Sequence, residues 1–311
     1  MNKLYLNAVF QLAVILVIIG LFLFDGLDIE KLKFIFMPKI ILLFIYLVIL
    51  KLFIAFLFFT VVNLVTTKKN YFNDIASTFL QGGIVNQLLP SAGFIFKYYK
   101  FKHIYGVSLA QYSFSQILLS LSSLLSYIIL AIIFGSIIII NFNVEFFFYA
   151  LLVLIFLIIS IIFIENRFYL SIKNILLKID RISNLINELI KIKNLILEKR
   201  KKLLYIFLGF LFLASLECLA FYSTIYLYEV EISFTKAIFL YVNTSLLTVV
   251  LLLNFIGLFE IILVISSALI LSDYTDMIYV SLGYKVLNTF ALIVAIIFLG
   301  LVSLFKKNNQ L

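Results

Sequence analysis

Long apolar runs separated by short polar and charged stretches dominate the pattern along the chain. A helix needs about 20 mainly apolar residues to cross about 30 Å of hydrocarbon. Six runs approach or exceed that length, at residues 4–24, 40–65, 112–140, 146–164, 203–228 and 282–305. The first run follows Lys3 as a signal sequence would, but it is long for one and ends at Asp25 without a cleavage pattern, so we interpret it as a retained anchor. The pattern predicts an all-α fold, a polytopic transmembrane helical bundle.

Two further apolar stretches carry helix-breaking residues and do not fit single spans. Residues 75–97 contain Gln81-Gly82-Gly83 and Pro90, and residues 237–271 are too long for one span and are interrupted near Asn254. A broken helix leaves backbone groups that lipid cannot satisfy, so each stretch must be shielded by protein or line a wet cavity. We therefore expect two re-entrant hairpins, each of which enters the membrane and returns on the same side.

Composition and charge narrow the class of protein. The chain has a formal charge of +9 and is 65% hydrophobic but only 13% charged, whereas soluble domains carry about 25% charged residues. Its basic residues lie between apolar runs and do not line a solvated groove, which argues against a nucleic-acid partner. Cys218 and His103 are the only residues of their kinds, which excludes a disulfide and a multi-histidine metal centre. We expect neither cofactor nor metal.

The distribution of Lys and Arg predicts the orientation. Residues 166–202 hold 10 basic residues against 3 acidic ones, so the positive-inside rule places this segment in the cytoplasm. Its apolar residues recur at three- and four-residue steps, which is typical of a basic amphipathic helix on the anionic leaflet. A helical hairpin over the cytoplasmic mouth of the bundle is the alternative. The basic residues at 97–103 and 306–307 fall on the same side, so both termini are expected to be cytoplasmic.

The predicted segments divide the chain into two membrane halves, residues 1–165 and 203–311, joined by the linker at 166–202. In each half a hairpin lies between two spans. The span, hairpin and span of the second half have the inverted membrane topology of those in the first half. Inverted repeats with broken helices that meet near the midplane are the architecture of many secondary transporters. The order of segments therefore predicts a cargo site between the halves.

Ionisable groups at membrane depth are costly and are functional candidates by default. Lys51, Glu217 and Glu260 are such groups, with snorkelling of Lys51, an ion pair of Glu217 and a helix cap by Glu260 as the structural alternatives. For Lys285, close to the start of its run, snorkelling is the favoured interpretation. We expect Glu217 and Glu260 to contact the cargo or to carry a coupling proton.

Amide side chains flank the first break. Asn86 and Gln87 precede Pro90 and Gly93, and Lys97 follows one turn later. Amides, unwound backbone, a helix start and a cation together suit a phosphate or another anionic headgroup. The structural alternative is that the amides only satisfy the broken backbone.

The segment Asn86-Gln87-Leu88-Leu89-Pro90-Ser91-Ala92-Gly93, followed by Lys97, resembles the membrane domain of the lysylphosphatidylglycerol synthase/flippase family. The segment from Asn254 to Glu260, with Gly257, is similar to the family's second signature, a Gly-rich break followed by Gly-x-x-Glu. The chain departs from the family where Phe94 replaces a common Glu and where Gln116 stands in the place of a Glu-Arg pair. The resemblance implies the translocating part of such a protein, without the synthase.

We expect a flippase-like protein of the bacterial inner membrane that moves an anionic lipid, either an aminoacylated phospholipid or a polyprenyl-phosphate-linked glycan. The candidate substrate-binding residues are Lys51, Asn86, Gln87, Pro90, Gly93, Lys97, Gln116, Glu217, Asn254, Gly257 and Glu260. Two other classes stay open: a membrane glycosyltransferase or its accessory subunit, with Asp28 and Glu30 holding a metal outside, and a small-molecule secondary transporter. The sequence leaves the cargo, the direction, the energy coupling and a homodimer open.

Overall fold

A computed structural model describes residues 38–66, 72–88, 92–138, 199–250, 258–270 and 275–308, and all regular structure in these ranges is helical. Four of the described helices are long and apolar enough to cross a membrane. They are α3 (Pro38–Val65), α6 (Leu109–Ile138), α10 (Arg200–Leu227) and α13 (Thr275–Asn308). These four confirm the corresponding predicted spans. The predicted spans at 4–24 and 146–164, and most of the linker at 166–202, lie outside the described residues.

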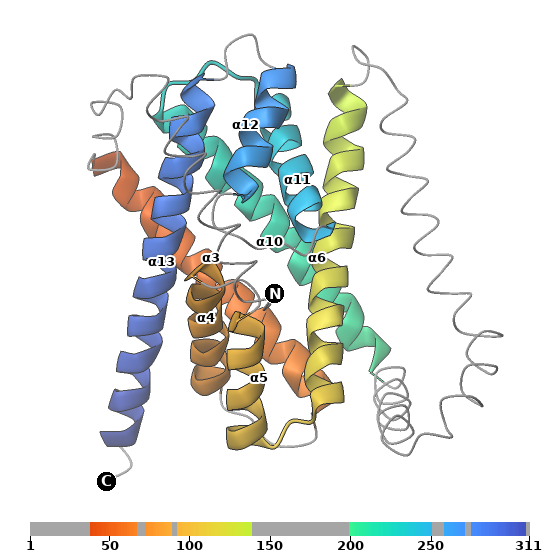
Figure 1. Ribbon diagram of the computed structural model, residues 1–311, viewed down its shortest axis with the longest axis vertical. Coiled ribbons are helices and arrows are strands. Elements are labelled where there is room, and N and C mark those ends of the chain that lie inside the picture. Colours follow the sequence, from red (N-terminus) through yellow and green to blue (C-terminus); the bar gives the residue numbers. More distant parts are fainter. Residues whose placement is uncertain are drawn as a thin grey trace, which may run out of the picture.

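Two pairs of shorter helices lie between the long ones. The first pair is α4 (Phe72–Leu88) and α5 (Ala92–Tyr105), and the second is α11 (Phe234–Val250) and α12 (Leu258–Ile270). The two helices of each pair pack against each other. Figure 1 shows that α4 and α5 occupy the lower part of the bundle and α11 and α12 the upper part, with both pairs reaching its middle. The interruptions of both pairs therefore come close to the same level.

The glycines of α4 do not break the helix, contrary to the prediction for Gln81-Gly82-Gly83. The helix continues to Leu88. Gly82 provides room for the close packing of α5, because a methyl group there would overlap the side chain of Lys97. A methyl group on Gly83 would make only ordinary contact, at 3.4 Å from Leu292 of α13.

Helix ends also differ from the ends of the apolar runs. Helix α13 begins at Thr275 and ends at Asn308, beyond both limits of the run at 282–305. The helix extends beyond the apolar run because helical hydrogen bonding continues past the point where hydropathy falls. Its first turn therefore includes the charged residue Asp276. As a result Lys285 lies well inside the helix and not near its start.

The long helices form the centre of the bundle. Helix α3 packs against α10 and α13, and α6 packs against α10 and α11. Leu47 and Phe221 are fully buried in this centre, and Phe58 is fully buried where α3 meets α4 and α5. Leu42 and Tyr226 are more than 70% exposed on the outer surface. A buried apolar interior combined with a strongly apolar exterior is the pattern of a bundle surrounded by lipid.

Charged residues separate between the two ends of the bundle. The end of α5, the start of α10 and the end of α13 lie together at the lower end in Figure 1. Basic residues at that end include Lys100, Lys102, His103, Lys201 and Lys202, against Asp74 in the first turn of α4. The turn after α10 at the upper end holds Glu229 and Glu231, with Asp276 and the cations Lys39 and Lys236 on neighbouring helices. The lower end is therefore the more basic one.

The close approach of α4 and α5 predicts that Gly93→Ala destabilises the protein. A methyl group there would overlap the Gly82 carbonyl oxygen and lie 2.6 Å from Asn86 Oδ1, and such overpacking costs about 1–3 kcal/mol. Thermal unfolding in detergent, followed with a dye that labels the buried thiol of Cys218, measures the loss. Gly300→Ala in α13 is the matched control, because nothing lies within 4 Å of that position. Equal midpoints for the two variants would contradict the packing argument.

Candidate functional site

A polar cavity lies between the two halves of the bundle. Its volume is about 340 Å³, and residues of α3, α4, α6, α10, α11, α12 and α13 line it. The lining residues of the long helices lie well inside their spans, and those of α4 and α11 lie in the second half of each helix or at its middle. The cavity is therefore where the interrupted helices and the middle of the long helices meet.

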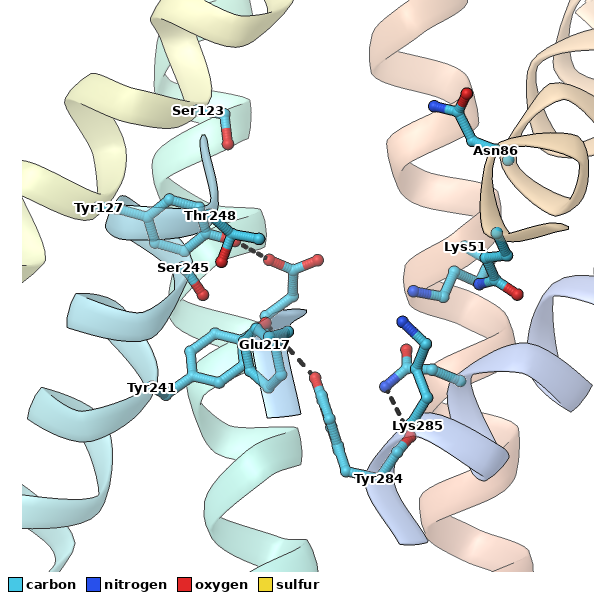
Figure 2. A pocket seen from close by; sticks show the side chains of 14 residues that line it. Lys51, Asn86, Ser123, Tyr127, Glu217, Tyr241, Ser245, Thr248, Tyr284 and Lys285 are labelled. Atoms are coloured by element: carbon cyan, nitrogen blue, oxygen red, sulfur yellow. Dashed lines mark hydrogen bonds between the residues drawn. The ribbon is translucent and has the colours of Figure 1, made fainter. Parts of the chain in front are cut away.

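The two walls of the cavity differ in chemistry. In Figure 2 the side chains of Lys51, Lys285 and Asn86 come from one side, and Glu217 and Tyr127 come from the other. Three hydroxyl residues share the second wall, namely Ser123, Ser245 and Thr248. Cations and an amide thus face a carboxylate surrounded by hydroxyl groups.

Glu217 is the described acidic residue of this site. The hydroxyl of Tyr127 donates a hydrogen bond to Glu217 Oε2 at 2.6 Å, which is the short distance of a charge-assisted bond. Lys51 attracts the carboxylate, and Lys285 repels Lys51. The bond to Tyr127 connects α10 to α6, and the attraction to Lys51 connects α10 to α3.

Tyrosines hold the helices around the carboxylate. The hydroxyls of Tyr284 and Tyr241 lie 3.5 Å apart, which connects α13 to α11. Tyr46 donates to the carbonyl oxygen of Leu216, which connects α3 to α10 beside Glu217. The ring of Tyr241 also packs at 5.1 Å from that of Phe221. These contacts fix the position of the cavity wall and leave its interior open.

The structure brings four of the predicted site residues together at the cavity: Lys51, Asn86, Gln87 and Glu217. Asn86 Oδ1 accepts the backbone N–H of Gly93 at 2.9 Å, so part of its polarity satisfies the start of α5, as the structural alternative expected. Gln87 Oε1 lies 3.3 Å from the hydroxyl of Thr289 and connects the first helix pair to α13.

Three other candidates, Gly93, Lys97 and Gln116, lie away from the cavity. The side chain of Lys97 packs on Gly82, and its Nζ lies 5.1 Å from the centre of the Phe79 ring, a cation–π contact inside the α4–α5 pair. Gln116 lies on α6, and its Nε2 is buried without a hydrogen-bond partner among the described residues. None of these three residues lines the cavity.

The remaining candidates lie wholly or partly beyond what is described. Pro90, Asn254 and Gly257 are outside the described residues. Glu260 belongs to α12 and follows Phe259, which lines the cavity, but its side chain is not described. The placement of the second break therefore stays a prediction.

Sequence analysis missed most of the hydroxyl residues of the cavity and the location of Lys285. Tyr241, Ser245 and Thr248 follow one another at four- and three-residue steps, and Ser123 and Tyr127 are also four residues apart. Such spacing places side chains on one face of a helix. Polar residues that recur at helical spacing inside apolar runs were the signal that could have identified this wall.

Comparisons with protein-family models, curated proteins and solved structures found no match. Within the described ranges, no group of His, Cys, Asp and Glu residues is arranged to hold a metal ion. Asp28 and Glu30 lie outside these ranges. The function of the site is therefore inferred from the geometry and chemistry of its own residues.

The bond between Tyr127 and Glu217 predicts that Tyr127→Phe destabilises the protein. The substitution removes a hydrogen bond to a charged group at a site away from bulk water, which costs about 1.5–3 kcal/mol. The thiol-labelling measurement of thermal unfolding applies here too. Tyr226→Phe is the control, because Tyr226 is on α10 but is 72% exposed. If the two variants unfold at the same temperature, the bond does not stabilise the fold.

Proposed function

We propose that the protein moves an anionic lipid from one leaflet of the membrane to the other, with the headgroup held in the polar cavity. The observation that carries this proposal is the cavity itself, where Lys51, Lys285 and Glu217 lie inside helices long enough to span a membrane. The apolar outer faces of these helices suit contact with acyl chains while the headgroup crosses between the halves.

The cost of these charges argues for a function. An ionisable group at membrane depth costs several kcal/mol unless it is paired or hydrated. One carboxylate and two ammonium groups belong to the described residues that line the cavity, and the ammonium groups can bind an anion. A phosphate is such an anion.

The resemblance noted in the sequence adds support. The motif residues Asn86 and Gly93 contact each other, and Asn86 also lines the cavity. The motif therefore lies at a position from which it can meet a headgroup. Lys97, which belongs to the same motif, would act by holding α5 on α4 and not by direct contact.

We further propose that the two halves are inverted repeats and that both short helix pairs are re-entrant. Exchanging α3 with α10, α4 with α11, α5 with α12 and α6 with α13 converts each principal packed pair of helices into another packed pair. Helices α4 and α11 are both 17 residues long. Asn86 and Thr248 occupy the same position in them, as do Gly83 and Ser245, and all four line the cavity. A repeated framework with one shared site favours transport.

In the proposed orientation, the lower end of Figure 1 faces the cytoplasm of a bacterial cell. Its excess of basic residues supports this assignment by the positive-inside rule. The α4–α5 pair then enters from the cytoplasm and the α11–α12 pair from outside. Both termini and the linker at 166–202 are cytoplasmic, the linker against the anionic leaflet.

Lipid translocation predicts that cavity variants lose transport. In proteoliposomes that contain a fluorescent anionic lipid, the wild type should make inner-leaflet lipid accessible to an external quencher. Lys51→Met and Glu217→Gln should slow this exchange about tenfold or more, since each removes at least about 1.4 kcal/mol of headgroup or wall interactions. Lys102→Met, at an exposed cation of α5, is the matched control.

Asp28→Asn combined with Glu30→Gln separates the proposal from a glycosyltransferase. A translocating protein should keep its rate in this double variant, whereas an enzyme that uses these acids for a metal should lose its activity. Exchange that is no faster than in empty vesicles, tested with both a phospholipid and a polyprenyl phosphate, would contradict lipid translocation. Uptake of a water-soluble anion in the same vesicles would instead favour a small-molecule transporter.

The orientation predicts opposite labelling of the two ends. In a Cys218→Ser background, Lys102→Cys should react with an impermeant thiol reagent only from the cytoplasmic side. Glu231→Cys should react from outside in intact cells, because both positions are exposed at opposite ends of the bundle. The background protein is the control, since it has no other cysteine. Labelling of both positions from one side would contradict the topology.

A further inference from the structure

The wall formed by Lys51, Lys285 and Asn86 offers hydrogen-bond donors. Asn86 Oδ1 is occupied by the N–H of Gly93, and a backbone N–H can only donate, so the amide nitrogen is the part of Asn86 left for a ligand. Figure 2 shows this nitrogen, and the ammonium ends of both lysines, on the side that faces the opposite wall. Three groups that can only donate meet on this wall, which is suited to phosphate oxygens.

The opposite wall offers acceptors and hydroxyl groups. Tyr127 donates to one oxygen of Glu217, so the second carboxylate oxygen can accept another hydrogen bond. Thr248 donates to the carbonyl oxygen of Thr244 and keeps its lone pairs. Ser123 and Ser245 line the cavity, and neither has a hydrogen-bond partner in the described part of the chain. This wall can bind a group that donates hydrogen bonds.

Charge determines which kind of donor fits. An ammonium group at the acceptor wall would lie in a cavity that the ammonium groups of Lys51 and Lys285 also line, and Lys285 and Lys51 repel each other. Like charges a few ångströms apart at low dielectric are strongly unfavourable. A hydroxyl group makes the same hydrogen bonds without that repulsion.

The size of the cavity is compatible with such a ligand. Its volume of about 340 Å³ lies in the range of small-molecule pockets, about 300–1,000 Å³, so a phosphate with a glycerol or one sugar fits this space.

We propose that the cavity is selective for a phosphodiester headgroup that carries a small polyol, and that it discriminates against headgroups that carry an ammonium. The phosphate lies on Lys51, Lys285 and Asn86, and the polyol hydroxyls lie on Glu217, Tyr127 and Ser245. This inference rests on the proposed function, since it names the cargo of the same cavity. It favours a hydroxylated lipid over an aminoacylated one.

Binding of three lipids with matched acyl chains to the purified full-length protein tests the selectivity. Phosphatidylglycerol has the phosphodiester and two hydroxyls, phosphatidylpropanol has the same charge without hydroxyls, and phosphatidylethanolamine carries an ammonium. Native mass spectrometry should give phosphatidylglycerol an affinity at least about tenfold above each of the others. A polyprenyl phosphate with one sugar, tested against polyprenyl phosphate alone, distinguishes the two sources of a small polyol.

Substitutions on each wall of the cavity test which part of the headgroup that wall recognises. Ser245→Ala and Tyr127→Phe should reduce the preference for phosphatidylglycerol over phosphatidylpropanol severalfold, because each removes a hydroxyl group that can contact the polyol. Lys285→Met should weaken phosphatidylglycerol and phosphatidylpropanol equally and raise the relative affinity for phosphatidylethanolamine, because a competing cation is gone. Ser223→Ala, at an exposed serine of α10, is the control and should behave as the wild type.

The outcomes distinguish the headgroup selectivity of the cavity from its role in lipid translocation. Equal or tighter binding of phosphatidylethanolamine, or a preference that Ser245→Ala and Tyr127→Phe both leave intact, would overturn the selectivity. Leaflet exchange of all three lipids at one rate would also overturn it while supporting translocation. Selective binding without leaflet exchange would support the selectivity of the cavity and contradict its role in translocation.

Discussion

A half-buried carboxylate in the middle of an apolar bundle is the constraint on which the rest of the structure depends. Glu217 can lie there because Tyr127 donates to it and Lys51 attracts it, and these partners belong to α6 and α3, while Glu217 itself belongs to α10. Three long helices must therefore keep their relative positions and rotations. Apolar packing alone would allow them to slide and rotate past one another at lower cost.

The sequence was sufficient for the parts of the fold that depend on hydropathy and chain breaks. The apolar runs predicted α3, α6, α10 and α13, and the helix break predicted around Pro90 agrees with the end of α4 at Leu88 and the start of α5 at Ala92. Gly82 and Gly83 were misjudged. A glycine that breaks an isolated helix is favourable where another helix packs on it, as α5 packs on Gly82. That contact is a tertiary one, so it cannot be predicted from the local sequence pattern.

The candidate site was accessible from the sequence only where a residue contrasted with its surroundings. Glu217 and Lys51 were identifiable as charges inside apolar runs. Lys285 was not, since the start of α13 at Thr275 could not be located from hydropathy, and that start decides whether the ammonium reaches the surface or the cavity. Tyr241 and Ser245 count as ordinary residues of a membrane helix until the bundle brings them beside the carboxylate.

The contact between Gly82 and Gly93 determines how the cavity can change shape. Backbone touches backbone there, and the Asn86 side chain completes the contact, so the corner that carries Asn86 has no internal freedom. Any widening of the cavity on this side requires α4 and α5 to move together as a rigid body. Such a motion would change the contact of Gly83 with Leu292 of α13 and the connection of α5 to α6 at residues 106–108.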